Sequence, residues 1–239
     1  MRPDTVPLPP VAILAGGLAT RMRPRTETIA KSMLEVAGEP FIAHQLRLLR
    51  REGVESVVLC LGFLGEQVAE YVGDGSRFGL RVAVSYDGPA LLGTGGALQT
   101  ALPLLGDNFF VLYGDSYLDV PMREVWERFR QSGQPALMTV HRNEGRWDTS
   151  NVVYDGSRVA YYSKRDRRPD MDYIDFGLGL LSAVLFAERP AEQGFDLAEL
   201  YEELAASGRL AGWESRQRFF EIGTPSGLAE TDRYLRTGS

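Results

Sequence analysis

The sequence has very little cysteine and histidine, with one cysteine and two histidines. Its single cysteine, Cys60, lies in the apolar stretch VVLCLGF, which excludes an intramolecular disulfide and predicts a buried strand residue. The two histidines, His44 and His141, have no neighbours at the spacing of a zinc site or of a Ser-His-Asp triad. We therefore assign no chemistry to Cys60 and expect both histidines to be structural or surface residues.

Long apolar runs and an excess of positive charge are also missing. No stretch approaches the roughly 20 apolar residues of a membrane span, and the opening MRPDTVPLPP lacks the apolar segment of a signal peptide. We therefore expect a cytoplasmic protein with no membrane partner. The net charge of -6 argues against nonspecific nucleic-acid binding, which requires a basic face, so we expect no nucleic-acid partner. Any anionic ligand must be held by a local pocket.

The first half of the sequence alternates apolar strands with amphipathic helices. The predicted strands are PVAILAG, ESVVLCLG, LRVAVSY and FFVLYG, and the predicted helices are PFIAHQLRLLRREG, LGEQVAEYVG, TGGALQTALPLL and PMREVWERFRQSG. This alternation predicts right-handed crossovers and an α/β fold with a mostly parallel central sheet covered on both faces.

After residue 135 the pattern changes. The segments ALMTVHR, NVVYDGSRVAYYSK and YIDFGLGLLSAVLF are rich in aromatic and turn residues, and DGS between two of these runs predicts a hairpin. We expect a small antiparallel lobe there, then a helix near 196–207, a short strand pair within 209–222 and a terminal helix from Pro225. The whole chain, 1–239, is predicted to be one domain, with the parallel half at about 10–135 and the lobe at about 136–225.

The stretch LAGGLATRMRPRTETIAKSML, residues 14–34, combines a glycine turn with four cationic side chains. It directly follows the first predicted strand, at the sheet edge where ligands bind in open α/β folds. Its two glycines allow close approach of backbone N–H groups to an anion, and its positive charges suit a polyphosphate; they are Arg21, Arg23, Arg25 and Lys31. The spacing fits neither a Walker A loop nor a dinucleotide fingerprint. Taken alone, two glycines and a few arginines favour an exposed basic turn, because such loops are common.

The complete stretch resembles the signature of the sugar-1-phosphate nucleotidyltransferases, L-A-G-G-x-G-T-R-L-x-P-x-T followed by a lysine and usually a proline. The residues in matching places are Leu14, Ala15, Gly16, Gly17, Thr20, Arg21, Pro24, Thr26 and Lys31. Ala19 replaces a glycine, and Ser32 replaces the proline. Three further segments, LLGTGGAL, YGDSYL and FFEIGTPSGL, resemble the family's L-G-T-[AG]-G-A-L, G-D and x-D-x-G-T-P elements in the correct order. The resemblance implies the family's Rossmann-like fold.

The resemblance also implies roles for individual residues. Arg21 and Lys31 are the expected catalytic residues on the phosphates, and Asp115 with Glu221 is the expected site of Mg²⁺, the implied cofactor. Glu221 stands where the family has an aspartate. The nucleotide-binding residues implied are Leu14, Ala15, Gly16, Gly17, Gly93 and Thr94. To these we add Asp87, just upstream of the base-binding element.

The expected sugar-phosphate contacts lie in the antiparallel lobe. YYSKRD resembles the family's E-K-P segment, which places Lys164 on the sugar phosphate and Ser163 where a glutamate is usual. YIDFGLGLL resembles N-x-G-[IV]-Y, with Asp175 in the asparagine position and Gly177 retained. Asn151 falls where a glycine is common. These three changed positions predict an unusual sugar.

The implied reaction transfers a nucleoside monophosphate from a nucleoside triphosphate to a sugar 1-phosphate, releasing pyrophosphate. Because Asp87 could accept hydrogen bonds from guanine, and because the chain most resembles short heptose- or mannose-1-phosphate guanylyltransferases and N-acetylmuramate-1-phosphate uridylyltransferases, we favour GTP with a heptose or hexose 1-phosphate. The alternatives are UTP, dTTP or CTP as donor, a non-sugar acceptor such as phosphocholine, and a noncatalytic nucleotide-sugar sensor. The triphosphate and the sugar 1-phosphate are the expected partners, with a homodimer as the candidate assembly.

Overall fold

The computed structural model describes residues 6–88, 92–146, 149–187, 189 and 194–237. Its centre is a parallel sheet of four strands in the order β6-β1-β4-β5, formed by Asn108–Tyr113, Val11–Leu14, Ser56–Leu61 and Arg81–Tyr86. In the middle strand, Ile13 pairs with Leu59 on one side and Leu112 on the other. Each strand matches a stretch predicted from the apolar pattern, and their carboxyl ends meet at one edge of the sheet.

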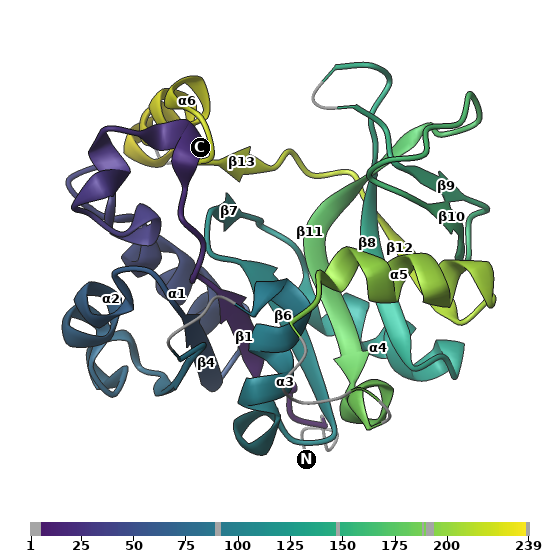
Figure 1. The fold of residues 1–239 in the computed structure, drawn as a ribbon, viewed down its shortest axis with the longest axis horizontal. Coiled ribbons are helices and arrows are strands. Elements are labelled where there is room, and N and C mark those ends of the chain that lie inside the picture. The colour runs from purple at the N-terminus through teal and green to yellow at the C-terminus, as the bar shows by residue number, and fades with distance from the viewer. Residues whose placement is uncertain (1–5, 89–91, 147–148, 188, 190–193, 238–239) are drawn as a thin grey trace, which may run out of the picture.

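The second half of the chain extends this same sheet with antiparallel pairings (Figure 1). Strand β11 (Tyr173–Ser182) runs antiparallel to β6 and also pairs with β8 (Ala136–Arg142). The predicted hairpin is formed by β9 (Val152–Tyr154) and β10 (Val159–Tyr162), with the DGS turn between them. The lobe is therefore continuous with the central sheet, and together they make one sheet of nine of the described strands.

The strand pair expected within 209–222 is wrong. Two strands do form there, β12 (Leu210–Ser215) and β13 (Phe220–Glu221), but they do not pair with each other in the described part of the chain. Strand β12 runs parallel to β8, whereas β13 pairs with β7 (Ser116–Tyr117). A further short pair joins β2 (Glu35–Val36) to β3 (Glu39–Pro40).

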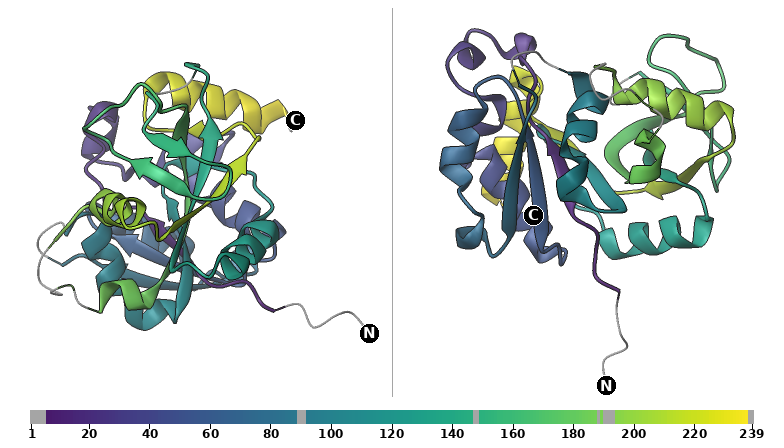
Figure 2. Two further views of the ribbon diagram at one scale, coloured as in Figure 1. Left: turned by 90° about the vertical axis from the view of Figure 1, so that its right-hand side faces the viewer. Right: turned by 60° about the horizontal axis from the view of Figure 1, so that its bottom comes forward.

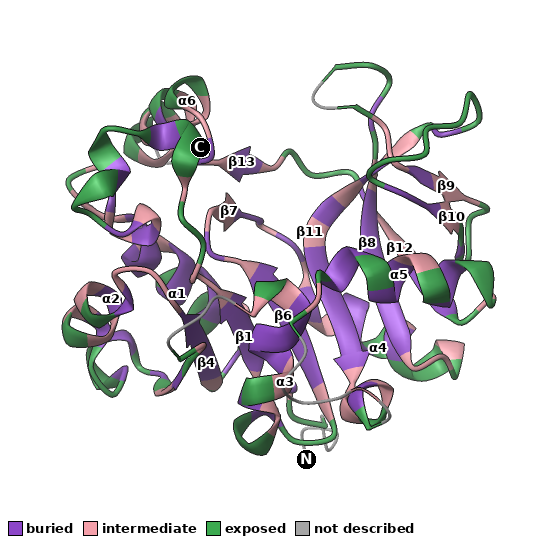
Figure 3. Cartoon of the chain, in the orientation of Figure 1, coloured by how far each residue is buried: buried purple, intermediate pink, exposed green. Residues whose placement is uncertain are grey.

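Helices cover both faces of the sheet (Figures 1 and 2). One face packs against α1 (Phe41–Arg51), α2 (Gly65–Val72) and α4 (Met122–Ser132). The other packs against α3 (Gly93–Leu105) and α5 (Leu197–Ala206). Consequently β1, β4 and β6 are buried along most of their length, whereas the edge strand β5 is mostly half-buried (Figure 3). The predicted apolar face of α1, from Phe41 to Leu49, is buried as its 3.6-residue spacing requires.

The C-terminal helix α6 (Pro225–Thr237) returns to the segment that follows β1. It packs in a third apolar cluster with Met22, Leu34 and Val36, and the carboxylate of Asp232 accepts a hydrogen bond from the N–H of Ala37 at 2.7 Å. The connecting residues include short 3₁₀ turns at Thr20–Met22, Arg25–Glu27 and Lys31–Met33. Others lie at Ser76–Phe78 and Ala183–Phe186. Among the described helices, none combines the length and apolarity that crossing a membrane requires.

Candidate active site

A cavity of about 260 Å³ opens at the carboxyl ends of the parallel strands. Its walls come from the loop after β1, the residue after β5, the start of α3 and the turn after β6, which is the location expected for a ligand in an open α/β sheet. The residues that line it include Leu14, Ala15, Gly16, Gly17, Lys31, Asp87, Gly93, Thr94 and Asp115. All seven residues predicted to bind the nucleotide therefore lie around this one cavity.

Close backbone packing explains two glycines of this cavity. A Cβ atom on Gly16 would lie 2.9 Å from the N atom of Gly62 and 3.3 Å from Oδ2 of Asp87. A Cβ atom on Gly114 would lie 2.8 Å from the Cβ of Ala15. Because the loops after neighbouring strands touch at these points, a larger residue at either position would push the loops apart.

A second cavity, of about 610 Å³, adjoins the first on the side of the antiparallel lobe. Tyr113 and Asp115 line both cavities, so the two form one continuous cleft. The lining of the second cavity includes the remaining predicted site residues Arg21, Asn151, Lys164, Asp175, Gly177 and Glu221. The structure thus brings every predicted site residue to one cleft, from segments as far apart in the chain as Leu14 and Glu221.

Charged side chains converge where the two cavities join. Nζ of Lys31 lies 2.5 Å from Oδ2 of Asp115 in a partly buried ion pair. A Cβ atom on Gly223 would lie 3.4 Å from Nζ of Lys31, 3.4 Å from Oε2 of Glu221 and 3.5 Å from a terminal nitrogen of Arg21. Gly223 therefore leaves open the space around which two cations and two carboxylates gather.

The turn that carries Asp115 is held in place by hydrogen bonds from α1. The buried side chain of Gln45 in α1 donates hydrogen bonds to the carbonyl oxygens of Tyr113 and Ser116, at 2.9 and 2.7 Å. The carbonyl of Asp115 accepts from the N–H of Ile222 at 2.9 Å, which holds the Glu221 strand beside it. Sequence reasoning missed Gln45, although a glutamine on the otherwise apolar face of FIAHQLRLL was a signal that could have found it. It also missed Tyr113.

The two carboxylates suit a magnesium ion that is shared with a phosphate. The described residues contain no group of three or more His, Cys, Asp or Glu side chains that could hold a metal alone. Mg²⁺, however, is commonly held by one or two carboxylates while substrate phosphates supply further oxygens. Asp115 and Glu221, beside a cavity of the size of a nucleotide fragment, fit that donor set.

The carboxyl of Asp87 and the thiol of Cys60, which both line the first cavity, have raised pKa values. Burial raises the pKa of Asp87, and the N–H of Leu92 opposes this in part. Burial, with a smaller effect from the Asp87 charge, raises the pKa of Cys60 to about 12. Cys60 is a buried residue of β4 that lines the cavity wall as a neutral thiol, in agreement with its assignment to a strand. The neighbouring residues 89–91, the last of which opens the predicted base-binding element, lie outside the described part of the chain.

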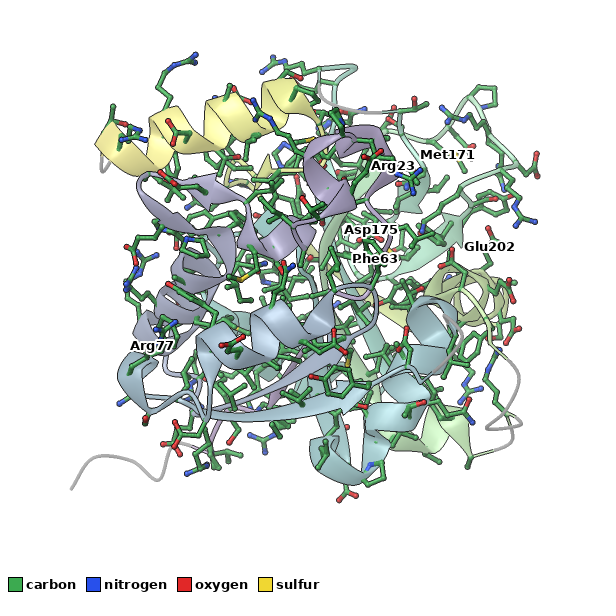
Figure 4. The ribbon with its side chains drawn as sticks, turned by 60° about the vertical axis from the view of Figure 1, so that its left-hand side comes forward. Arg23, Phe63, Arg77, Met171, Asp175 and Glu202 are labelled. Carbon is green, nitrogen blue, oxygen red and sulfur yellow. The ribbon has the colours of Figure 1, made fainter. Side chains whose placement is uncertain are left out.

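Asp175 reaches the second cavity through an irregularity in β11. The pairing of β11 with β8 shifts register between Asp175 and Gly179, and Gly177 has a φ of 95°, which favours glycine. The N–H of Asp175 donates to Oδ1 of Asn151 at 2.9 Å, and its carboxylate accepts from the N–H of Gly177 at 2.9 Å. Burial raises the pKa of Asp175, with Gly177 and the charge of Lys164 opposing it. Asp175 is labelled near the middle of the view in Figure 4.

The predicted basic residues of the segment after β1 do not all reach the cleft. Arg21 and Lys31 line it, whereas Arg23 and Arg25 are exposed and line neither cavity among the described residues. Figure 4 labels Arg23 on the segment that follows β1. Ser163, which replaces a usual glutamate, is buried and its hydroxyl accepts from the N–H groups of Arg165 and Asp166, so it stabilises a turn.

The distribution of lysine supports the same location. The chain has 26 lysine and arginine residues, but only Lys31 and Lys164 are lysines. Both line the cleft, one in each cavity. Arginine supplies the positive charge everywhere else, so a general preference for lysine on the surface does not explain these two positions. Lysine presents a compact cation with rotatable donors, and that suits phosphate oxygens whose positions change during a reaction.

Comparison with known proteins agrees with this geometry. Residues 11–150 match the family model described as nucleotidyl transferase. An N-acetylmuramate alpha-1-phosphate uridylyltransferase of Neisseria meningitidis serogroup B is 30% identical over 224 residues, which cover 91% of this chain and 94% of that protein. A mannose-1-phosphate guanylyltransferase catalytic subunit beta of Danio rerio is 28% identical over 89% of this chain, which spans 61% of that protein's length.

Solved structures share the fold. HddC from Yersinia pseudotuberculosis, complexed with GMP-PN, superposes with a TM-score of 0.76 at 22% identity, covering 95% of this chain and all of the other. UTP-bound UGPase from Acinetobacter baumannii gives a TM-score of 0.74 at 18% identity, covering 97% of this chain and 94% of the other. On the match of residues 11–150 and the 30% identity to a full-length relative, the chain belongs to the nucleotidyl transferase family of enzymes.

Proposed function

We propose that the protein transfers a nucleoside monophosphate from a nucleoside triphosphate to a sugar 1-phosphate, giving a nucleotide sugar and pyrophosphate. The observation that carries the proposal is the convergence of Arg21, Lys31, Asp115 and Glu221 at the point where two cavities of one cleft meet. We assign the first cavity to the nucleotide and the second cavity, which is lined by Lys164, to the acceptor. The named relatives carry out reactions of this type on sugar 1-phosphates.

The proposed mechanism depends on alignment and charge, and it requires no general base. The attacking oxygen of a sugar 1-phosphate is already anionic at neutral pH, so catalysis must hold two anions together and stabilise the charge of the transition state. Lys31 would bridge the α-phosphate and the attacking oxygen, while Arg21 would bind the β- and γ-phosphates that leave as pyrophosphate. Lys164 would hold the acceptor phosphate.

We further propose Mg²⁺ as the cofactor, held by Asp115 and Glu221. The ion would supply positive charge to phosphate oxygens. Lys31 pairs with Asp115 at 2.5 Å in this structure, so its ammonium group already lies within reach of the same phosphates. With Asp115 engaged as a metal ligand, the Lys31 ammonium group would be available to bind the substrate phosphates.

Guanine is the base that we favour. Asp87 lines the nucleotide cavity with its Oδ2 beside the Gly16 turn, where a carboxylate could accept from guanine N1–H and N2–H₂. Uracil and thymine present one acidic N–H between two carbonyl groups and cannot make both of these contacts. A guanylyltransferase and a uridylyltransferase both occur among the relatives, so Asp87 is the feature of this chain that favours GTP.

The acceptor is proposed to be a heptose or hexose 1-phosphate. The second cavity is lined by Lys164, Asn151 and Asp175, and burial raises the pKa of the Asp175 carboxyl. Phe176 and Phe219 add apolar surface to the same lining. Such a mixture of hydrogen-bonding groups and aromatic rings suits the polar edges and apolar faces of a sugar ring.

The test is a matrix of substrates. Each of the five common nucleoside triphosphates is incubated with a panel of sugar 1-phosphates and with phosphocholine in the presence of Mg²⁺, and released pyrophosphate is measured. We expect release with GTP and a heptose or hexose 1-phosphate. Release only with phosphocholine would replace the sugar acceptor, and no release with any pair, together with tight nucleotide-sugar binding, would indicate a noncatalytic sensor.

A further inference from the structure

The start of α5 is hydrogen-bonded to the start of α3 beside the cleft. The hydroxyl of Thr94, in the first turn of α3, donates to Oδ1 of Asp196 at 3.0 Å and accepts from the N–H of Leu197 at 2.8 Å. The N–H of Gly95 donates to the carbonyl of Phe195 at 2.9 Å. The segment 194–197 therefore forms the outer support of the helix start that lines the nucleotide cavity.

The carboxylate of Asp196 also faces the acceptor side of the cleft. Its Oδ1 lies 3.8 Å from Nζ of Lys164, and the same oxygen accepts from the N–H of Ala198 at 2.9 Å as the cap of α5. Burial acts to raise the pKa of Asp196, but the Ala198 N–H, the charge of Lys164 and the Thr94 hydroxyl outweigh it, so the pKa lies below its ordinary value. Asp196 is thus ionised at neutral pH.

Asp196 therefore stands between the two halves of the cleft without lining either one. Thr94 belongs to the first cavity and Lys164 to the second, and the described lining of neither cavity includes Asp196. One carboxylate oxygen contacts both residues. An aspartate needed only to cap α5 would have no reason to be placed within reach of one of the chain's two lysines.

We propose that Asp196 is a positioning residue that holds Lys164 at a fixed distance from the nucleotide-binding start of α3. The inference rests on the proposed function, because it assigns the acceptor phosphate to Lys164. A free lysine side chain has many rotamers, and a fixed anion on the nucleotide side restricts the ammonium group to the side where the two phosphates meet. The acceptor then binds a cation that is already aligned.

The first test does not depend on turnover. The wild-type protein and Asp196→Asn are pulse-labelled with an amine-selective reagent, and labelling of Lys31 and Lys164 is measured by mass spectrometry. Asparagine keeps the oxygen that accepts from Ala198 and Thr94 but removes the charge that faces Lys164. We expect Lys164 to label about fivefold faster in Asp196→Asn, the effect of losing one exposed ion pair, while Lys31 keeps its rate. An unchanged Lys164 rate, or an equal change at both lysines, would overturn the proposal.

Thr94 provides the second arm of this test. Thr94→Val removes both bonds of the hydroxyl and should also accelerate labelling of Lys164, whereas Thr94→Ser keeps the hydroxyl and should restore the wild-type rate. Asp155→Asn is the matched control, because Asp155 also caps a turn and pairs with an arginine, Arg158, but lines neither described cavity. A labelling change in the Asp155 variant, or none in Thr94→Val, contradicts the assignment.

A kinetic cycle separates positioning from general stability. In the wild-type background, Asp196→Asn should raise the KM for the sugar 1-phosphate about fivefold and leave the KM for the triphosphate within twofold. In a Lys164→Met background the same substitution should change neither value. Additive effects in the two backgrounds, or equal rises in both KM values, would refute the role of Asp196. Absence of pyrophosphate release by the wild-type protein would instead refute the proposed function, and the labelling result would still decide on Asp196.

Discussion

At the scale of single residues, Arg21 is the cation with the most demanding proposed role. It approaches the Gly223 space from the segment after β1 and lines the acceptor cavity. Loss of one preorganised charge at a transition state costs about 2.7–4 kcal/mol, or about 10²–10³ in kcat. We expect Arg21→Ala to lose this much activity in the pyrophosphate assay, while Arg25→Ala, an exposed arginine on the same segment, stays within twofold. Comparable activity of the two variants would remove Arg21 from the mechanism.

Ala19 is a residue whose backbone conformation conflicts with its side chain. It occupies the place of a family glycine and has a φ of 48° and a ψ of 41°, held there by a 2.9 Å hydrogen bond from the Thr26 hydroxyl to its carbonyl. The left-handed conformation costs an L-residue about 1–2 kcal/mol, which glycine would not incur. Glycine in turn lowers the free energy of unfolding by about 0.4–1 kcal/mol, because it gives the unfolded chain more conformational entropy.

Ala19→Gly is therefore expected to stabilise the protein by about 0.5–1 kcal/mol. Urea unfolding of the two proteins measures the difference. The matched control is Ala37→Gly, at the other described alanine with a positive φ, which lies outside both described cavities. A loss of stability at Ala19 alone would mean that the loop uses its methyl group for packing.

Cys60 should be chemically inert in the folded protein. Burial raises its pKa to about 12, so almost none of it is thiolate at pH 8, and the thiolate is the reactive form. Because the folded-state pKa is raised, the contribution of Cys60 to stability is complete below the unfolded-state pKa near 9 and is lost as the pH rises toward 12. We expect alkylation by iodoacetamide to be negligible at pH 8 until the protein is unfolded by urea, and rapid labelling of native protein would contradict this environment.

At the scale of secondary-structure elements, the close contact between α3 and the segment before α5 is decisive for the nucleotide cavity. A Cβ atom on Gly95 would lie 2.1 Å from a ring carbon of Phe195. Gly95→Ala must therefore displace this ring, and overpacking of this kind costs about 1–3 kcal/mol, which exceeds the gain in helix propensity of about 1 kcal/mol.

The prediction for Gly95→Ala is a net destabilisation together with a raised KM for the triphosphate. Phe195→Leu should relieve the clash, so that Gly95→Ala costs less in that background than in the wild-type protein. Denaturant unfolding of the four proteins in the cycle measures the coupling. Strict additivity would show that the ring and the glycine do not share this space.

Elements of the parallel half could be predicted from the sequence because their signals are local. The strand before the glycine turn and the helix α1, which ends at Arg51 shortly before Gly53, each carry their own periodicity and stop signal, and the glycine turn itself identified the cavity. The partners of β12 and β13 could not be predicted, since pairing depends on which strand edge is free after the chain has folded. The same holds for Asp196, whose two contacts come from residues 102 and 32 positions away.

At the scale of the whole molecule, the cleft is built from parts that are distant in sequence. The glycine turn, the Asp115 turn and the Glu221 strand are joined by backbone hydrogen bonds from Gly114 to Leu14 and from Ile222 to Asp115, each 2.9 Å long. A ligand that contacts all three parts must stabilise the fold as a unit, because unfolding of any part destroys the site.

Binding of Mg²⁺ and the correct triphosphate should therefore raise the melting temperature. At a ligand concentration 100 times the Kd, the gain is about 2.7 kcal/mol, equivalent to about 5–10 °C for a domain of this size. Without the divalent ion, the negative charges of Asp115 and Glu221 would repel the phosphates, so we expect EDTA to abolish most of the shift. Asp115→Asn should show a small shift of the melting temperature both with Mg²⁺ and with EDTA. The variant lacks a metal ligand, so Mg²⁺ adds little, and Lys31 is no longer neutralised by Asp115, so some triphosphate binding persists without the ion. A full shift for the wild-type protein in EDTA would show that the cations Arg21 and Lys31 alone hold the triphosphate.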